Sequence, residues 1–230
     1  MYVSSYDRSL EQIIQRVNHL ADDVYRMLAQ SLESLYHQNK PMARTVLDHD
    51  DYVDDETNAI EEDSLLLISL QQPRQKDLRI LAAALRNVRD LERIADYACD
   101  IAEVTEILAH NPYFKPLIDI PLLGAITLDM LKLAAQAVNT HDTELARDVY
   151  HQDDTVDNLY IRLHGELMEA MRQQATIVEQ ASYLSLVARY LERIADHAVN
   201  IAEMTVFVEN GNRRPFRRSP LPSGHSTEDQ

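Results

Sequence analysis

Residues 89–103, Arg-Asp-Leu-Glu-Arg-Ile-Ala-Asp-Tyr-Ala-Cys-Asp-Ile-Ala-Glu, recur at 189–203 as Arg-Tyr-Leu-Glu-Arg-Ile-Ala-Asp-His-Ala-Val-Asn-Ile-Ala-Glu. Eleven of the 15 positions are identical, at a separation of 100 residues. A second, weaker pair consists of Asp-Asp-Tyr-Val-Asp at 50–54 and Asp-Asp-Thr-Val-Asp at 153–157. Similarity at a fixed separation is the signature of a repeated structural unit. We therefore predict that the chain contains two copies of one unit of about 100 residues.

Within each copy, apolar residues recur every three or four positions, which is the spacing of one face of an α-helix. Prolines at 41 and 73, and the segment from His110 to Pro121, mark helix starts and a break in this pattern. The predicted fold is therefore all-α, with two tandem, pseudo-symmetric three-helix bundles built from long helices. The helices are expected at 4–38, 41–71, 73–109, 121–139, 142–172 and 176–209.

The domain boundaries follow from the same breaks. We expect a first three-helix repeat at 1–111 and a second at 112–210, because His110-Asn-Pro112 ends the helical pattern of the first copy. Residues 211–230 contain three prolines and four arginines in a short stretch. That composition is typical of a segment without a packed core, so we predict a disordered tail there.

Composition limits the classes of function. The chain has a formal net charge of −16, so its surface should repel phosphate backbones, and we expect no binding of nucleic acid. The single cysteine, Cys99, allows no intramolecular disulfide and is expected to be a small core residue. Residues 1–8 do not begin a secretory signal, and no apolar run approaches the ~18 residues of a membrane span. The expected location is the cytoplasm.

The repeated motif places acidic residues on one side of a helix. At about 100° per residue, Glu92, Asp96, Asp100 and Glu103 form a narrow stripe beside the apolar face. The second copy repeats the stripe with Glu192, Asp196, Asn200 and Glu203. Asp50 and Asp54, and Asp153 and Asp157, show the same i,i+4 spacing on the preceding helix of each unit.

Two interpretations of these stripes remain open from spacing alone. If adjacent helices turn their carboxylates toward one groove, each unit would hold a cluster of cations, since hard cations prefer oxygen ligands. Alternatively, the stripes are solvated acidic faces that Arg89, Arg93, Arg189 and Arg193 pair locally. His197 lies about 100° from Asp196 and is predicted to be a surface histidine rather than a ligand.

Signatures of catalysis are missing from the sequence. It contains no Glu-x-x-His, no HExxH, no GxSxG and no phosphate-binding glycine loop. We therefore expect a protein that is not an enzyme and has no catalytic residues. A metal-dependent phosphohydrolase and a metal-free helical scaffold remain as alternatives, because clusters of carboxylate-bound metals can hydrolyse phosphoesters.

Residues 71–79, Gln-Gln-Pro-Arg-Gln-Lys-Asp-Leu-Arg, together with 90–103 and the second copy at 191–203, resemble the PhoU family of phosphate-specific transport accessory proteins. The resemblance covers about residues 1–210. It implies two three-helix bundles with an E(D)xxxD motif on helices of each bundle, where some members bind iron or zinc clusters. By that pattern, the implied ligands are Asp50, Asp54, Glu92 and Asp96 in the first unit and Asp153, Asp157, Glu192 and Asp196 in the second, with Asp100 and Asn200 as additional ligands.

The resemblance also implies a function. PhoU-like proteins restrain the phosphate-starvation response when phosphate is ample, and they connect the phosphate transporter ATPase subunit with a sensor histidine kinase. We therefore expect a metal-binding regulator that binds divalent or trivalent ions (iron, zinc, manganese or magnesium) and forms homodimers. It would reach the membrane only through its partners.

Overall fold

The computed structural model describes residues 5–211, and this part of the chain is helical without any strand. The first half contains α1 (Ser5–His37), α2 (Lys40–Leu47), α3 (Asp50–Gln71) and α4 (Gln75–Leu108). The second half contains α5 (Asp119–Thr140), α6 (Thr143–Gln173), the 3-10 turn η1 (Ala175–Ile177) and α7 (Val178–Asn210). The predicted all-α fold of two repeated bundles is confirmed.

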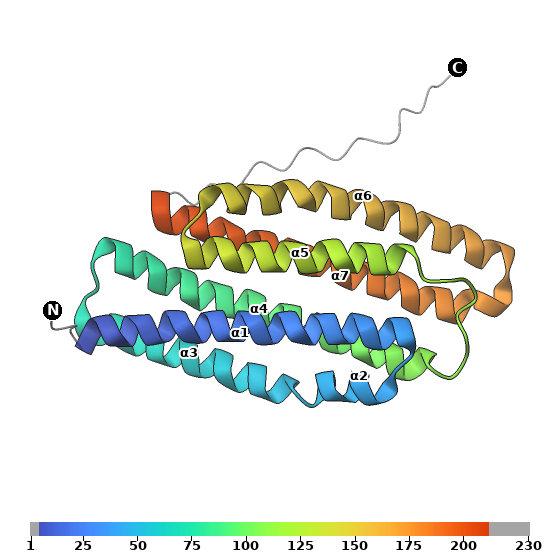
Figure 1. Cartoon of the computed structure of the whole chain (residues 1–230), viewed down its shortest axis with the longest axis horizontal. Coiled ribbons are helices and arrows are strands. Elements are labelled where there is room, and N and C mark those ends of the chain that lie inside the picture. Colours follow the sequence, from blue (N-terminus) through green and yellow to red (C-terminus); the bar gives the residue numbers. More distant parts are fainter. Residues whose placement is uncertain (1–4, 212–230) are drawn as a thin grey trace, which may run out of the picture.

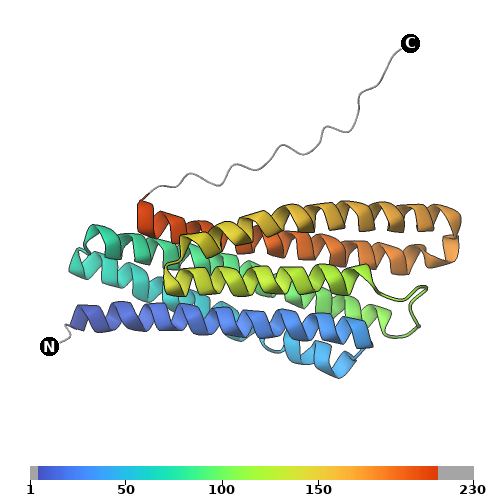
Figure 2. The same cartoon turned by 45° about the horizontal axis from the view of Figure 1, so that its top comes forward.

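The two bundles lie side by side with their long axes nearly parallel (Figures 1 and 2). Contacts between them run from α4 to α7 and from α1 to α5. The buried apolar side chains of both bundles form one continuous core, in which Leu91 and Ile94 of α4 and their counterparts Leu191 and Ile194 of α7 take part. The repeated motif therefore builds the seam that joins the two units.

The connection between the units is the segment between α4 and α5, which contains the predicted boundary at residues 111 and 112. Hydrogen bonds to both bundles anchor this segment; among them, Phe114 N donates to Gln180 Oε1 at 2.6 Å, and the Tyr113 hydroxyl donates to Leu35 O at 2.5 Å. The predicted disordered tail, 211–230, lies outside the described residues except for Gly211. Gly211 ends α7 at φ 66°, a left-handed conformation that favours glycine.

The prediction of one helix over 41–71 was wrong, because the chain breaks between α2 and α3 at Asp48 and His49. His49 N donates to Val46 O at 3.1 Å, a tighter i→i−3 bond that replaces the helical i→i−4 bond. Val46 and Val53, on either side of the break, are both fully buried. The break lets α2 and α3 each turn an apolar face toward the core.

Two predicted helix starts were also misplaced. The helix predicted from residue 73 begins at Gln75, because Gln72 is left-handed at φ 45° and Arg74 is extended. The helix predicted from residue 176 begins at Val178, after the 3-10 turn η1. The start after Asn39 is as expected, since its side chain accepts a hydrogen bond from Met42 N at 3.2 Å.

Helix α5 can approach α1 closely because residue 124 is a glycine. A Cβ atom at Gly124 would stand 2.8 Å from Leu32 Cδ1 of α1, so the missing side chain permits the approach. Among residues 5–211, α5 is also the one helix whose length and mean hydropathy, 1.3 over its best window, would suit a membrane span. In this fold it packs against α1, α6 and α7, with Leu123 and Met130 fully buried.

Candidate functional site

Four predicted carboxylates come together between α3 and α4. We call Asp50, Asp54, Glu92 and Asp96 the first acidic cluster. Partial burial raises the pKa of Asp54, and repulsion from Asp50, Glu92 and Asp96 raises it further. Burial likewise raises the pKa of Asp96, an effect that Arg93 opposes and that Asp50 and Glu92 reinforce. These carboxylates are therefore close enough to repel one another, as the convergence of the two stripes requires.

Arginines pair with two members of the first acidic cluster. Arg89 Nη1 donates to Glu92 Oε2 at 2.7 Å, and its Nε donates to Glu61 Oε1 at 2.6 Å. Arg93 Nη1 lies 3.0 Å from Asp96 Oδ2. The Arg89 side chain is about half exposed and that of Arg93 about two-thirds exposed, so these pairs are surface pairs of modest strength. Glu92 and Asp96 thus each have an arginine partner. Among the ion pairs of the described residues, none joins an arginine to Asp50 or Asp54.

Cys99 lies at the buried edge of the first acidic cluster. Its Sγ donates to Asp50 Oδ1 at 3.4 Å, and burial together with the nearby carboxylates raises the pKa of the thiol. A thiol with a raised pKa stays protonated at neutral pH and makes a poor nucleophile. The prediction that Cys99 is a small core residue is confirmed, with the added hydrogen bond to Asp50.

The second unit builds a similar cluster between α6 and α7. We call Asp157, Glu192 and Asp196 the second acidic cluster. Burial raises the pKa of Glu192, repulsion from Asp196 and Asp157 adds to the effect, and Arg193 and Arg189 oppose it. Asp153, one turn before Asp157 on α6, is buried with only 5% of its surface exposed.

Asp100 and Asn200 point elsewhere. Burial raises the pKa of Asp100, with repulsion from Glu103 and Asp96 on its own helix. Asp100 also contributes to the raised pKa of Tyr190 on α7, so it faces the other bundle. Asn200 Nδ2 donates to Asp90 Oδ1 at 3.1 Å across the same seam. The structure thus places both residues at the contact between the two units, whereas their role as metal ligands stays a prediction.

A buried polar contact at this seam was missed from the sequence. Asp90 of α4 is 8% exposed, and its Oδ1 lies 2.7 Å from His197 Nδ1 of α7. A carboxylate only accepts hydrogen bonds, so Nδ1 of His197 carries the proton that it donates. Tyr97 stacks on Tyr190 at 5.7 Å between ring centroids and lies 6.0 Å from the His197 ring. The prediction that His197 is a surface histidine was wrong, because α4 packs against that face of α7.

The repeat itself held a signal for this contact. Only four of the 15 motif positions differ between the copies, and three of those four lie at the seam. The differing residues at the seam are Asp90 and Tyr190, Tyr97 and His197, and Asp100 and Asn200. Across the seam Asp90 contacts His197, the counterpart of Tyr97, and Tyr97 stacks on Tyr190, the counterpart of Asp90. The two copies therefore use the same positions at the seam but with different residues.

The donor chemistry of both acidic clusters suits hard cations, since carboxylate oxygens are the ligands such ions prefer. Burial is the main cause of the raised pKa values of Asp54, Asp96 and Glu192, and repulsion between the carboxylates adds to it; a bound cation would relieve the repulsion. Within residues 5–211, no three His, Cys, Asp or Glu side chains are arranged closely enough to enclose an ion. The clusters suit metal ions in charge and in ligand type, but they do not form an enclosing site as they stand, so metal binding by them stays a prediction.

The repulsion at Asp54 gives a prediction about pH. A raised pKa means that the folded state binds the proton more tightly than the unfolded state, so ionised Asp54 destabilises the fold. In chelator at low salt, Asp54→Asn should increase the free energy of unfolding at neutral pH by a few tenths of a kcal/mol, up to about 1, after screening. The gain should shrink as pH falls and vanish below ~3.9, the ordinary pKa of an aspartate, where the carboxyl is protonated in both the folded and the unfolded state. Urea unfolding at several pH values measures it.

Asp55→Asn is the matched control, because Asp55 is exposed on the same helix and does not contribute to the raised pKa of Asp54. It should change the free energy of unfolding less at every pH. An equal gain for Asp54→Asn at pH 4 and at pH 7 would show that the carboxylates do not repel one another in solution.

Comparison with known proteins agrees with the architecture. The profile of the PhoU domain matches residues 17–105 and 120–205, once in each bundle. A phosphate-specific transport system accessory protein PhoU homolog from Aquifex aeolicus (strain VF5) is 36% identical over 204 residues, covering 89% of this chain and 92% of that protein. The homolog from Zymomonas mobilis is 34% identical over 190 residues, covering 83% and 80%.

Solved structures are similar over the same span. The crystal structure of PhoU from Pseudomonas aeruginosa superposes with a TM-score of 0.88 at 26% identity, covering 90% of this chain and 100% of that one. The phosphate transport system regulatory protein PhoU from Streptococcus pneumoniae gives a TM-score of 0.86 at 25% identity, covering 92% and 100%. The likeness therefore extends over both bundles and the seam between them.

Proposed function

Because the chain belongs to the PhoU family, we propose that it regulates phosphate uptake and the phosphate-starvation response. The observation that carries this proposal is the match over both bundles to relatives named as accessory proteins of the phosphate-specific transport system. The absence of any catalytic signature in the sequence agrees with a protein that acts by binding. The chain would therefore work through contacts with other proteins rather than through a reaction of its own.

The proposed partners are the phosphate transporter ATPase subunit and a sensor histidine kinase, with a second copy of the chain as a dimer partner. A net charge of −16 supports association with basic surfaces of such partners, because complementary charge speeds encounter and selects orientation. The proposed location is the cytoplasm, with the membrane reached through the partners alone.

The two acidic clusters are proposed to bind divalent or trivalent metal ions, among iron, zinc, manganese and magnesium. In the first unit Asp50, Asp54, Glu92 and Asp96 would hold the metal. In the second, Asp153, Asp157, Glu192 and Asp196 would do so, with Asp100 and Asn200 as further candidates beside them. A bound ion would supply positive charge, cancel the repulsion between α3 and α4 or between α6 and α7, and hold each helix pair together.

Regulation is tested in the organism that encodes the chain. Deleting its gene should switch on a phosphate-starvation promoter reporter in medium with ample phosphate, and the wild-type gene should silence the reporter again. The proposed role depends on restraint by this protein, so a reporter that stays silent in the deletion strain contradicts it. Reporter activity in starved cells is the control, because it shows that the promoter itself responds.

A further inference from the structure

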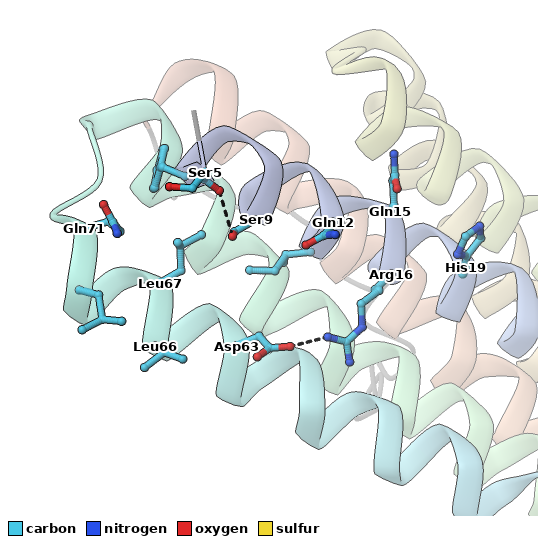
Figure 3. Close-up of a pocket in the computed structure, with 13 residues that line it drawn as sticks. Ser5, Ser9, Gln12, Gln15, Arg16, His19, Asp63, Leu66, Leu67 and Gln71 are labelled. Carbon is cyan, nitrogen blue, oxygen red and sulfur yellow. Dashed lines mark hydrogen bonds and ion pairs between the residues drawn. The ribbon is translucent and has the colours of Figure 1, made fainter. Parts of the chain in front are cut away.

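A groove opens between α1 and α3 at one end of the first bundle (Figure 3). Its volume is about 620 Å³, and we call it the α1–α3 groove. Leu66 and Leu67 of α3 line it on one side, and Ser9 and Gln12 of α1 line it on the other. A volume of this size is sufficient for a drug-sized molecule or for part of an extended chain segment.

Part of the apolar lining of this groove is uncovered. Leu66 is 55% exposed and Leu70 is 67% exposed, and both line the groove. Neighbouring Leu65 is 56% exposed but does not line it. Three leucines this exposed within six residues are unusual on a helix, and contiguous exposed apolar surface marks a docking site more often than a single exposed leucine does.

The charge around the groove favours a positively charged occupant. The eight acidic residues of helix α3 all lie between Asp50 and Asp63; of these, Asp63 lines the groove and exposed Glu62 lies one turn before Leu66. Arg16 of α1 lines the groove but is already paired, with Glu56 Oε1 at 2.7 Å and with Asp63 Oδ2 at 2.6 Å. Arg8 and Arg74 are also exposed at this end of the bundle and would repel a basic segment. Attraction of such a segment would therefore have to come from Glu62 and Asp63 of α3. An apolar segment with basic residues would fit.

The chain carries a segment of that chemistry in residues 212–230, beyond the described part. Its first half reads Asn-Arg-Arg-Pro-Phe-Arg-Arg-Ser-Pro-Leu-Pro over 212–222. Four arginines thus flank Phe216 and precede Leu221, in a chain that is otherwise strongly acidic. Proline-rich segments lose little conformational entropy on binding because they are already extended.

The chain leaves α7 at the end of the molecule where the groove lies. Figures 1 and 2 show the end of α7, the turn between α3 and α4 and the start of α1 at this same end. Gly211 lies beside the guanidinium of Arg79 on α4, and Arg79 Nε donates to Val208 O at 2.8 Å. Two residues before Arg79, Asp77 accepts a hydrogen bond at 3.1 Å from the hydroxyl of Tyr6, which lines the groove.

The distance is within reach of the segment. Crossing α4 from Gly211 to Tyr6 spans about two helix diameters at most, or roughly 20 Å. At about 3.3 Å per residue, Leu221 can lie about 33 Å from Gly211 and so reach beyond Tyr6 into the groove, whereas Phe216, at about 17 Å, reaches only toward its near edge. A tether this short gives an effective concentration on the order of millimolar, so even weak contacts would keep the groove occupied.

We propose that residues 212–230 dock in the α1–α3 groove of their own chain, with apolar side chains against Leu66 and Leu70 and arginines near Glu62 and Asp63 of α3. The tail is then an internal ligand that covers the exposed leucines. It would also compete with any other protein for this surface, which is separate from the two acidic clusters.

The chain contains no tryptophan, so Leu221→Trp creates a single fluorescent reporter in the full-length protein, at the apolar residue of the segment that can reach the groove. Docked against leucines, its emission should lie at shorter wavelength than that of a free peptide of residues 212–230 with the same substitution. Adding Leu66→Ser and Leu70→Ser should move the emission to the free-peptide value, whereas adding Leu65→Ser should leave it unchanged. High salt should also weaken the shift, because the Debye length falls to ~3 Å at 1 M.

Tryptic cleavage in the native tail gives a second measurement without the tryptophan. Leu66→Ser with Leu70→Ser should speed cleavage after the tail arginines about tenfold, the factor expected for a tail that is docked nine-tenths of the time. Leu65→Ser should not change the rate. Identical emission and cleavage in all variants would overturn the proposal. So would an emission shift that grows with protein concentration, since that would mean that another copy supplies the tail.

Discussion

Replacing His197 by leucine should lower the free energy of unfolding by about 3 kcal/mol, because it leaves the Asp90 carboxylate buried with a neutral amide as its remaining partner at the seam. Breaking a buried pair on one side costs more than the pair contributes, since the remaining charge has lost its solvation. Urea unfolding followed by circular dichroism measures the change.

The double variant Asp90→Leu with His197→Leu separates this reason from a simple loss of packing. Removing both polar groups should recover most of the lost stability, as replacement of buried ion pairs by apolar residues often does. His164→Leu is the matched control, since His164 is exposed and hydrogen-bonds only Ser185, at 2.8 Å, across two helices of the second unit. It should change the free energy of unfolding by less than about 0.5 kcal/mol. A similarly small change for His197→Leu would mean that the two bundles do not meet at Asp90 in solution.

Adding metal ions to chelator-treated protein should raise its melting temperature by about 5–10 °C at a free-ion concentration near 100 times the dissociation constant. Binding to the folded state alone contributes about 2.7 kcal/mol at that concentration, and a chain of this size gains about 2–4 °C per kcal/mol. The physical reason is that the carboxylates of each acidic cluster repel one another, whereas each of them would be attracted to a cation bound between them. Scanning calorimetry with iron, zinc, manganese and magnesium in turn measures the shift.

Asp96→Ala with Asp196→Ala should lower the amount of metal bound while leaving the helix content nearly unchanged, because each removes one carboxylate from a cluster. Glu62→Gln on α3 is the control, since Glu62 is exposed and takes no part in the repulsion around Asp54. A melting temperature that changes neither with chelator nor with added metal ions would favour the metal-free scaffold. Phosphoester turnover that is lost on changing Glu92 and Glu192 would favour the hydrolase.

Much of the site was predictable because each acidic cluster depends on helical periodicity. Carboxylates spaced by four residues on consecutive antiparallel helices must share a side of the bundle if the apolar faces meet, and Asp50, Asp54, Glu92 and Asp96 do so. Asn200 shows where this reasoning fails. Asn200 continues the acidic stripe along its own helix. However, α4 of the other unit packs against it, and the Asn200 side-chain amide donates a hydrogen bond to Asp90 of that helix.

Local sequence alone determined the helices, the duplication and the stripes, since hydrophobic spacing and capping residues act within a few positions of the chain. The break at Asp48 and His49, the buried pair of Asp90 with His197, and the groove beside Leu66 and Leu70 were decided by packing. Each depends on how closely two helices approach and on which sides face each other, and residues far apart in the chain set those distances together. One copy of the repeat contains no information about the other copy's position, so the seam between them exists only in the folded molecule.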